Sequence, residues 1–275
     1  MTVFDKLYQD LISEIMSSGV EEYNQRTKLK TRIITGVHFN LNVTDFPLLT
    51  LRKMPLKLFV AEQIWYLQGD KDLSFFQNFS KIWDDFKEDN NTVSSAYGYR
   101  WRQFFERDQI QSLLSMLTKD PSSRQGVVLT WDANNDGLDG PPKKNVPCVP
   151  MWVANIVGGK LNFHVIFRSN DVMLGLPHDV AGFALLQHIL AQKLNVELGM
   201  LHYTVSHAHI YENHYPNAQE LLRRGHEHAG IKLKLPANSY DRALSKEEQI
   251  VSEIEQELSQ QYTPLASLGK MQIAL

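Results

Sequence analysis

The chain has 275 residues, 43% of them hydrophobic, and its 28 basic and 31 acidic residues leave a formal net charge of −3. A chain of this size can bury a full core, and no Pro/Gly/Ser-rich linker or low-complexity run divides it. The absence of a basic excess argues against a polynucleotide-binding surface, although a few arginines could hold a single nucleotide.

The sequence also lacks membrane and secretory signals. No apolar run approaches the roughly 18 residues of a membrane span, and residues 1–10 contain Asp5, Lys6 and Asp10 where a signal peptide would need an apolar core. Cys148 is the only cysteine, which fits a reducing compartment. We therefore expect a soluble, cytoplasmic protein with no membrane partner.

The first part of the chain predicts two long helices. Apolar residues recur at helical spacing over 3–16, and Gly19 is the expected stop. A second helix should begin at Pro55, whose fixed φ suits a first turn, and end near Leu67 before Gly69.

Glu62 is a charged residue inside this otherwise apolar second helix. Its carboxylate either reaches the rim or is kept at a site despite a desolvation cost of several kcal/mol. Helical geometry alone favours the rim, because glutamate is rarely fully buried.

A shorter helix and a strand follow. The helix should run from Gln109 to Leu117, opened by Asp108, and the strand from Gly126 to Trp131. The run 132–137 looks like the start of a calcium loop, but loop position twelve is Lys143 instead of the required glutamate. We therefore expect no calcium site here.

A β-hairpin is predicted in the middle of the chain. Val149 to Val157 is rich in strand-forming residues, Gly158-Gly159 supplies a turn, and Lys160 to Arg168 runs back. The pairing places the Cys148 thiol and the Arg168 guanidinium at the same end of one sheet. A cation lowers the pKa of a nearby thiol, and the planar guanidinium suits phosphate. A lone cysteine is more often buried filler, but this neighbour favours a nucleophile.

The hairpin is followed by a mostly apolar helix, Val180 to Leu194, with Asp179 at its N-terminal end. From the residues alone, Asp179 is best interpreted as a plain N-cap. The next strand, Leu201 to Ser206, delivers His207 and His209, but no carboxylate or cysteine completes a zinc set, so we expect no metal.

Near the C-terminus, Ser245 and Glu248 form a capping-box pattern. It should open an acidic helix that runs to about Gln261. We interpret this helix as a solvated surface addition.

Three motifs occur in a set order: Pro147-Cys148, then Arg168-Ser169-Asn170-Asp171 with Leu174-Gly175-Leu176-Pro177, then His209-Ile210-Tyr211-x-Asn213-His214. This order resembles the thymidylate synthase superfamily over residues 20–235 and again at residues 270–275. Asp179 stands where thymidylate synthases have an asparagine that reads uracil, and this exchange resembles bacteriophage deoxycytidylate (dCMP) hydroxymethylase. The resemblance implies one α+β domain over residues 1–275, built on a mixed sheet and forming a homodimer through the sheet face.

The resemblance also assigns roles by motif. The catalytic residues would be Cys148, Glu62 and Asp179. Phosphate would be held by Arg26, Arg124, Arg168 and Ser169, with Arg124 donated across the dimer interface. Base and sugar would be held by Asp179, His209, Tyr211 and Tyr97, and folate by Trp83, Asp171 and Gly175, with the tail at 270–275 folding over it. Positions that depart from the thymidylate synthase pattern are Arg100, Gln125, Val149 and His207, and Lys143 and Lys144 could compensate for Gln125.

The implied reaction transfers a one-carbon unit from 5,10-methylenetetrahydrofolate to C5 of dCMP and adds water. Cys148 would add to C6 of the base and Glu62 would manage protons, giving 5-hydroxymethyl-dCMP and tetrahydrofolate. Three alternatives stay open: a dCMP 5-methyltransferase that releases dihydrofolate, a thymidylate synthase acting on dUMP, and a non-catalytic nucleotide-binding or RNA-binding relative. The sugar, ribo or deoxyribo, is also open. If the protein is phage-encoded, it would act in the host cytoplasm.

Overall fold

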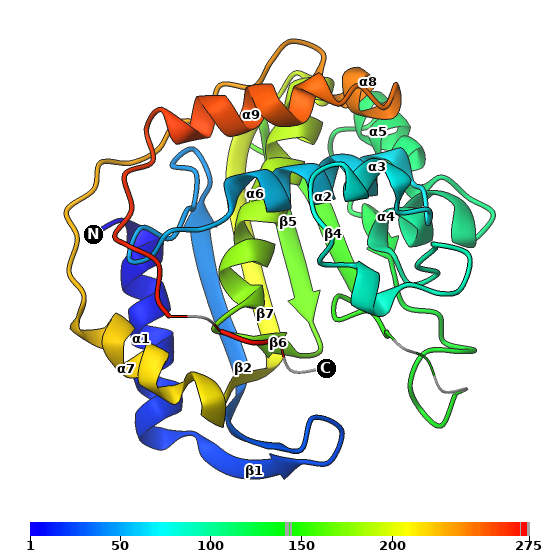
Figure 1. Ribbon diagram of the computed structural model, residues 1–275. Helices are drawn as coiled ribbons and strands as arrows, with labels where there is room; N and C mark the ends of the chain where they lie inside the picture. The colour runs from blue at the N-terminus through cyan, green and yellow to red at the C-terminus, as the bar shows by residue number, and fades with distance from the viewer. Residues whose placement is uncertain (141–142, 144, 270, 274–275) are drawn as a thin grey trace.

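The protein is built on one mixed β-sheet, shown in the computed structural model of Figure 1, which describes residues 1–140, 143, 145–269 and 271–273. The strand order is β1-β2-β7-β5-β4-β3, and β6 also pairs with β7. The strands are β1 Val20–Asn24, β2 Leu29–Asn42, β3 Val127–Leu129, β4 Met151–Val157, β5 Lys160–Phe167, β6 Asn170–Asp171 and β7 Glu197–Tyr211. β7 runs parallel to β5 and β6 but antiparallel to β2, so the predicted α+β fold with a mixed sheet is confirmed.

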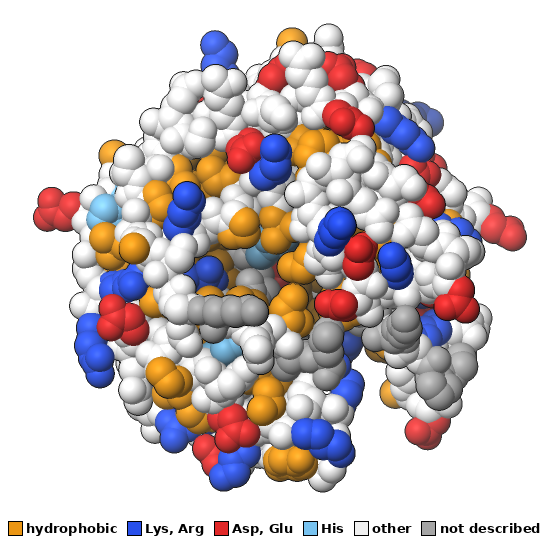
Figure 2. All heavy atoms as spheres, viewed as in Figure 1, with side chains coloured by type: hydrophobic (Ala, Val, Ile, Leu, Met, Phe, Trp, Pro, Cys, Tyr) orange, Lys and Arg blue, Asp and Glu red, His pale blue; other side chains and the backbone are white. Residues whose placement is uncertain are grey.

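The helices pack around this sheet. They are α1 Val3–Ser18, α2 Leu56–Gln68, α3 Ser74–Gln77, α4 Tyr97–Tyr99, α5 Gln109–Lys119, α6 Gly175–Leu194, α7 Tyr215–Arg223, α8 Ser239–Leu244 and α9 Gln249–Ser259, with further helical turns at Asp84–Phe86, Arg100–Phe104 and Glu212–His214. No helix in the described part of the chain is long and apolar enough to cross a membrane. Charged side chains of both signs are interspersed over the face seen in Figure 2.

The long helix α6 lies across β5 and β7 and is apolar almost all round, which is typical of a core helix (Figure 1). Along β5 and in the middle of β7, buried residues alternate with half-exposed ones. The buried set of β5 is Leu161, Phe163, Val165 and Phe167. The alternation places one face of the sheet in the core against α6 and leaves the other face half-exposed.

The predicted local elements are confirmed in the first half of the chain. α1 ends at Gly19, and α2 follows Pro55 and stops at Gly69, which adopts the left-handed conformation with φ 75°. Asp108 caps α5 by accepting from the backbone N–H of Gln111, and the β4–β5 hairpin turns at Gly158-Gly159.

Two predicted boundaries are wrong. α6 begins at Gly175, five residues before the predicted Val180, because Pro177 falls in the first turn, where its missing N–H is not needed. Asp179 is therefore inside the helix and is not its N-cap. β7 continues to Tyr211, because the long strand β2 pairs with it as far as the Thr31–Tyr211 pair.

The capping box is also wrong. Ser245 follows α8, and Glu248 precedes α9 without any side-chain cap hydrogen bond. α9 is no solvated addition either, because it buries Ile250, Val251, Ile254 and Leu258 and packs on α2. The acidic composition of α9 concealed this apolar face.

The run that looked like a calcium loop folds around a cation of the protein itself. The Arg100 guanidinium is 1% exposed and lies 3.3 Å from the Asp136 carboxylate and 3.9 Å from that of Asp132. Lys143 also pairs with Asp136, at 2.7 Å, so its ammonium is already engaged. Lys144 lies outside the described residues.

Candidate active site

The hairpin brings Cys148 and Arg168 together as predicted. Cys148 precedes β4 and Arg168 follows β5, and the Arg168 backbone N–H donates to the Cys148 carbonyl at 2.9 Å. The guanidinium donates through Nε to the Pro147 carbonyl at 2.8 Å and through Nη2 to the Val146 carbonyl at 2.9 Å. Nη2 lies 3.8 Å from Cys148 Sγ. Backbone carbonyls thus hold the guanidinium of an exposed side chain beside the thiol.

The thiol does not have the depressed pKa that the sequence suggested. Burial raises the pKa of Cys148, and the nearby Asp179 raises it further, whereas Arg168 and Arg26 oppose this rise. The prediction was wrong because a hairpin pattern reports the neighbouring cation but not the desolvation. In the free protein Cys148 is therefore a protonated thiol at neutral pH and needs activation.

Tyr97 of α4 contacts the backbone of Cys148. Its hydroxyl accepts a hydrogen bond from the Cys148 backbone N–H at 3.2 Å. Burial raises the pKa of Tyr97 well above the usual range, with Cys148 and Asp179 adding to the rise. The ring packs on Tyr66 of α2 at a centroid distance of 5.3 Å. Tyr97 is therefore a neutral hydroxyl within the site.

Glu62 is held inside the protein, so the rim interpretation is wrong. It is 8% exposed, and each of its carboxylate oxygens has a nitrogen partner. Trp83 Nε1 donates to Oε1 at 2.8 Å, and His178 Nε2 lies 2.9 Å from Oε2. The three side chains come from α2, the turn before Asp84–Phe86, and α6. Trp83 thus lies beside Glu62, as expected for a shared site.

The sequence analysis did not identify His178. Burial by itself lowers the pKa of this imidazole, but the charge and hydrogen bond of Glu62, together with the charge of Asp179, raise it above the ordinary histidine value. The raised pKa favours the imidazolium form of His178 opposite the Glu62 carboxylate. The signal available in the sequence was the position of His178, directly after Pro177 and directly before Asp179.

Asp179 lies in the second turn of α6 and is oriented by a neighbour. Asn170 Nδ2 donates to Asp179 Oδ2 at 2.7 Å. Burial raises the pKa of Asp179 to about 7, with Glu62 and Asp171 contributing, although His178 and Asn170 oppose the rise. This carboxyl group can take up or release a proton near neutral pH. Asn170, 4% exposed, is a second residue that the sequence analysis missed.

The end of β7 adds a second group of side chains. Asp171 of β6 pairs with His209, and its Oδ1 accepts from the backbone N–H groups of Met173 and Leu174 at 2.8 and 3.2 Å. His209 is 7% exposed, and burial lowers its pKa, so it is a neutral imidazole. Burial and Asp171 raise the pKa of Tyr211, while Arg26 opposes this. Asp171, His209 and Tyr211 therefore lie close together at the end of β7.

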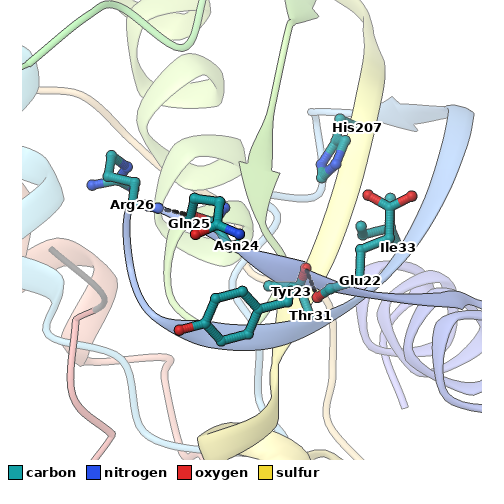
Figure 3. Close-up of a pocket in the computed structure, with 8 residues that line it drawn as sticks. All are labelled: Glu22, Tyr23, Asn24, Gln25, Arg26, Thr31, Ile33 and His207. Carbon is teal, nitrogen blue, oxygen red and sulfur yellow. Dashed lines mark hydrogen bonds between the residues drawn. The ribbon is translucent and has the colours of Figure 1, made fainter.

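Arg26 lies on the β1–β2 loop, next to an open hollow of about 320 Å³. The Asn24 side chain shapes the loop by accepting from the backbone N–H groups of Arg26 and Thr27 at 3.0 and 3.1 Å. Figure 3 shows Arg26 and His207 at opposite ends of this hollow. Cys148 does not line it. The hollow is thus distinct from the thiol site, although Arg26 is close enough to both to influence the pKa of Cys148.

The other predicted site residues lie at the periphery of the thiol site or away from it. Ser169 is half-buried between Arg168 and Asn170, and Gly175 lies beside Asp179, since a Cβ added there would be 3.3 Å from Asp179 Oδ2. Arg124 is exposed on the loop before β3. The β3–β4 register runs from the Leu129–Met151 pair to the Val127–Val153 pair, so Arg124 points toward the end of β4 farthest from Cys148. At ~3.3 Å per residue this separation is about 25 Å, so one chain does not bring Arg124 to its own thiol.

No cluster of histidine, cysteine, aspartate and glutamate suited to a metal ion occurs among the described residues. A thiol, a guanidinium beside it and two carboxyl groups, one buried and one half-buried, suit nucleophilic chemistry on a small charged substrate. Comparison with known proteins identifies the family to which a chain with this site belongs. Residues 6–260 match the family model described as thymidylate synthase.

A solved structure agrees with this match. The thermostable thymidylate synthase A from Bacillus subtilis is similar, with a TM-score of 0.76 and 28% sequence identity, over 84% of this chain and 88% of that chain. The chain belongs to the thymidylate synthase family. The chemistry of the family is folate-dependent one-carbon transfer to a pyrimidine nucleotide, with methylenetetrahydrofolate as the donor.

The raised pKa of Asp179 predicts a stability cost that depends on pH. Because the folded protein binds a proton at Asp179 more tightly than the unfolded chain, this residue makes the fold less stable as pH rises from about 4 to about 7. Asp179→Asn removes this loss. At pH 8 we expect the free energy of unfolding of the variant to exceed that of the wild type by on the order of 3 kcal/mol. This gain should vanish below pH 4.

Urea unfolding of both proteins from pH 4 to pH 8 measures this difference. Asp89→Asn, which neutralises an exposed aspartate, is the matched control and should show no such trend. A stability difference at Asp179 that is constant with pH would contradict the assignment.

Proposed function

We propose that the protein transfers the one-carbon unit of 5,10-methylenetetrahydrofolate to C5 of dCMP and adds water, yielding 5-hydroxymethyl-dCMP and tetrahydrofolate. The observation that carries this proposal is Asp179, a half-buried carboxyl group that is oriented by Asn170 and lies close enough to Cys148 to raise the pKa of its thiol. An enzyme that reads a base must match its donors and acceptors, because an unmatched buried polar group costs about 1–3 kcal/mol.

A carboxyl group at position 179 matches cytosine. Cytosine presents the N4 amino group as a donor, and its N3 gains a proton when a nucleophile adds at C6. A carboxylate accepts from both, and a carboxyl group with a pKa of about 7 can also supply the N3 proton. Uracil presents an acceptor at O4 and a donor at N3, which an amide would match better. The chemistry of Asp179 therefore supports a cytosine nucleotide.

The same proton transfer would help to activate Cys148. The negative charge of Asp179 raises the pKa of Cys148, so the thiolate is disfavoured while Asp179 is ionised. Pairing of this carboxylate with a protonated N3 removes the uncompensated charge, and Arg168 then favours the thiolate. Binding of the base would thus prepare the nucleophile, which adds to C6 and makes C5 able to attack.

The remaining side chains suit the other parts of the substrates. The Arg168 guanidinium and the Ser169 hydroxyl would hold phosphate, with Arg26 from the β1–β2 loop. His209 and Tyr211 would hold the sugar. The half-buried Trp83 indole offers an aromatic surface and Asp171 a carboxylate acceptor, and together with Gly175 these residues fit a pterin. The bound folate would supply the one-carbon unit.

Two carboxyl groups favour water as the final reactant. Glu62 and Asp179 would give a water molecule acceptors on two sides, and general-base assistance of this kind is worth about a hundredfold or more. One observation favours the rival dCMP 5-methyltransferase: His214 Nε2 lies 3.0 Å from the Gln272 carbonyl, which holds the tail near the end of β7 and could exclude water. Residues 270 and 274–275 of the tail lie outside the described residues.

The proposal is tested by incubating the protein with dCMP and methylenetetrahydrofolate. We expect 5-hydroxymethyl-dCMP by mass spectrometry and no rise in dihydrofolate absorbance. Cys148→Ala is the control and should give no product. Dihydrofolate formed in proportion to product would show hydride transfer and replace the hydroxymethylase with the methyltransferase, whereas product from dUMP alone would indicate a thymidylate synthase.

Base preference gives a direct prediction for Asp179. Asp179→Asn should shift the ratio of kcat/KM for dCMP over that for dUMP toward dUMP by about tenfold to a hundredfold, because the amide pairs with uracil and leaves cytosine unmatched. Competition between the two labelled nucleotides measures the ratio. An unchanged ratio would remove Asp179 from base recognition.

A homodimer through the half-exposed sheet face would bring Arg124 to a site. This face includes His164 and Thr204, and no described helix packs on it at these residues as α6 does on the other face. Since Arg124 lies about 25 Å along β4 from its own Cys148, we propose that it serves the phosphate in the partner subunit.

Co-expressed, differently tagged subunits test this arrangement. A heterodimer of Arg124→Ala with Cys148→Ala retains one complete site, so its activity should recover to about half that of the wild type. The matched pair Arg168→Ala with Cys148→Ala leaves both sites defective and should stay inactive. Equal inactivity of both heterodimers would place Arg124 outside the partner's site.

A further inference from the structure

His178 is a half-buried histidine in contact with a residue that the proposed function uses. It is the fourth residue of α6, and 18% of its side chain is exposed. One edge of the ring packs against Phe59 of α2, with centroids 6.2 Å apart and planes at 86°. Nε2 reaches Glu62 Oε2 at 2.9 Å. The imidazole thus fills the space between α2 and α6 and directs one nitrogen at the carboxylate.

We propose that His178 is a positioning residue that, as an imidazolium, keeps Glu62 ionised and oriented as the base of the reaction. This inference rests on the proposed function, and it gives that function the group that controls its proton acceptor. Trp83 Nε1 holds the other oxygen of Glu62 at 2.8 Å. With both oxygens held from separate elements, the carboxylate cannot rotate without breaking a hydrogen bond.

The charge balance of the site requires such a cation. Glu62 and Asp179 are two carboxyl groups close enough to influence one another, and repulsion alone would favour protonation of either. His178 contacts Glu62 directly and is adjacent to Asp179 in sequence. The imidazolium therefore favours ionised Glu62, while burial leaves Asp179 able to carry a proton. The two carboxyl groups are thereby assigned different tasks, base and proton donor.

Other ionisable groups also act on this pair. Those identified by their electrostatic influence are Tyr66 on α2, Arg52 before α2, Asp171 on β6 and Tyr97 on α4. Arg52 is occupied by the Met173 carbonyl, to which its Nη2 donates at 2.6 Å. Burial raises the pKa of both tyrosines well above the usual range, so they stay neutral across the working range of pH. The groups of this site that can change protonation near neutral pH are therefore His178 and Asp179.

A second histidine on the same helix provides a matched control. His188 is 5% exposed, and its Nε2 lies 2.8 Å from the neutral Val43 carbonyl. Burial lowers the pKa of His188 to about 4, because no carboxylate compensates for the lost hydration. His188 thus lies on the same helix as His178 and differs from it in its partner, a neutral carbonyl in place of a carboxylate.

The first test is an NMR titration of the histidine side chains in the free protein. We expect His178 to titrate above 6.5, the ordinary value, and Glu62→Gln to lower its midpoint by about one pH unit or more. His188 should titrate near 4 in both proteins. A His178 midpoint at or below 6.5, or one that is the same in Glu62→Gln, would overturn the ion pair.

The second test is the pH dependence of kcat for dCMP. In His178→Gln, which keeps a donor but loses the charge, the acid limb should move to higher pH by about one unit. In His178→Phe, which keeps an aromatic ring but removes both ring nitrogens, kcat should fall roughly tenfold to a hundredfold with little change in KM. His188→Gln should leave the profile of the wild type unchanged. An unshifted acid limb in His178→Gln would overturn the positioning role.

The two tests separate this inference from the proposed function. Absence of turnover by the wild type with either dCMP or dUMP would overturn the proposed function, and with it the use of the pair in catalysis. The NMR titration would then show whether the ion pair itself exists. If the NMR signals of the other histidines in a variant match those of the wild type, misfolding is excluded as the cause of its lost activity.

Discussion

Burial of α6 between the sheet and α2 is the constraint on which the site depends. The helix is apolar on nearly all sides, so it packs in the core, and its first two turns carry His178 and Asp179 out of bulk water with it. Desolvation is the largest influence on both groups and also on Cys148. The unusual protonation behaviour of the site therefore follows from the packing of one helix. The hydrogen bond that Glu62 accepts from His178 and the one that Asn170 donates to Asp179 determine how each group responds.

The proposed function and the stability of the fold place opposite demands on Asp179. A desolvated carboxyl group is costly unless it is paired, and the nearby His178 together with a single amide donor from Asn170 compensates Asp179 only in part. Glu62 has two donors, one of them an imidazolium, and is better compensated. Under the proposed function the less compensated group is the one that exchanges a proton with the base, which would account for a residue that weakens the fold.

Much of the fold could be predicted from the sequence where the signal is local. The hairpin, the ends of α1 and α2 and the cap of α5 follow from glycine, proline and aspartate at positions where only a few conformations are possible. The resemblance also selected Glu62 and Asp179, which the structure places close enough to influence one another. What could not be predicted depends on non-local packing: the raised pKa of Cys148 follows from burial, and the raised pKa of His178 depends on a carboxylate 116 residues away. The position of Arg124 required the register between β3 and β4, which a single sequence does not specify.

The central claim is that this site makes C5 of a cytosine nucleotide reactive. Release of tritium from C5-labelled dCMP, dependent on methylenetetrahydrofolate, measures this step whatever the final product is. We predict release from dCMP at a rate well above that from C5-labelled dUMP, and none from either nucleotide with Cys148→Ala. No release from dCMP by the wild type, or release from dUMP at an equal or higher rate, would contradict the account.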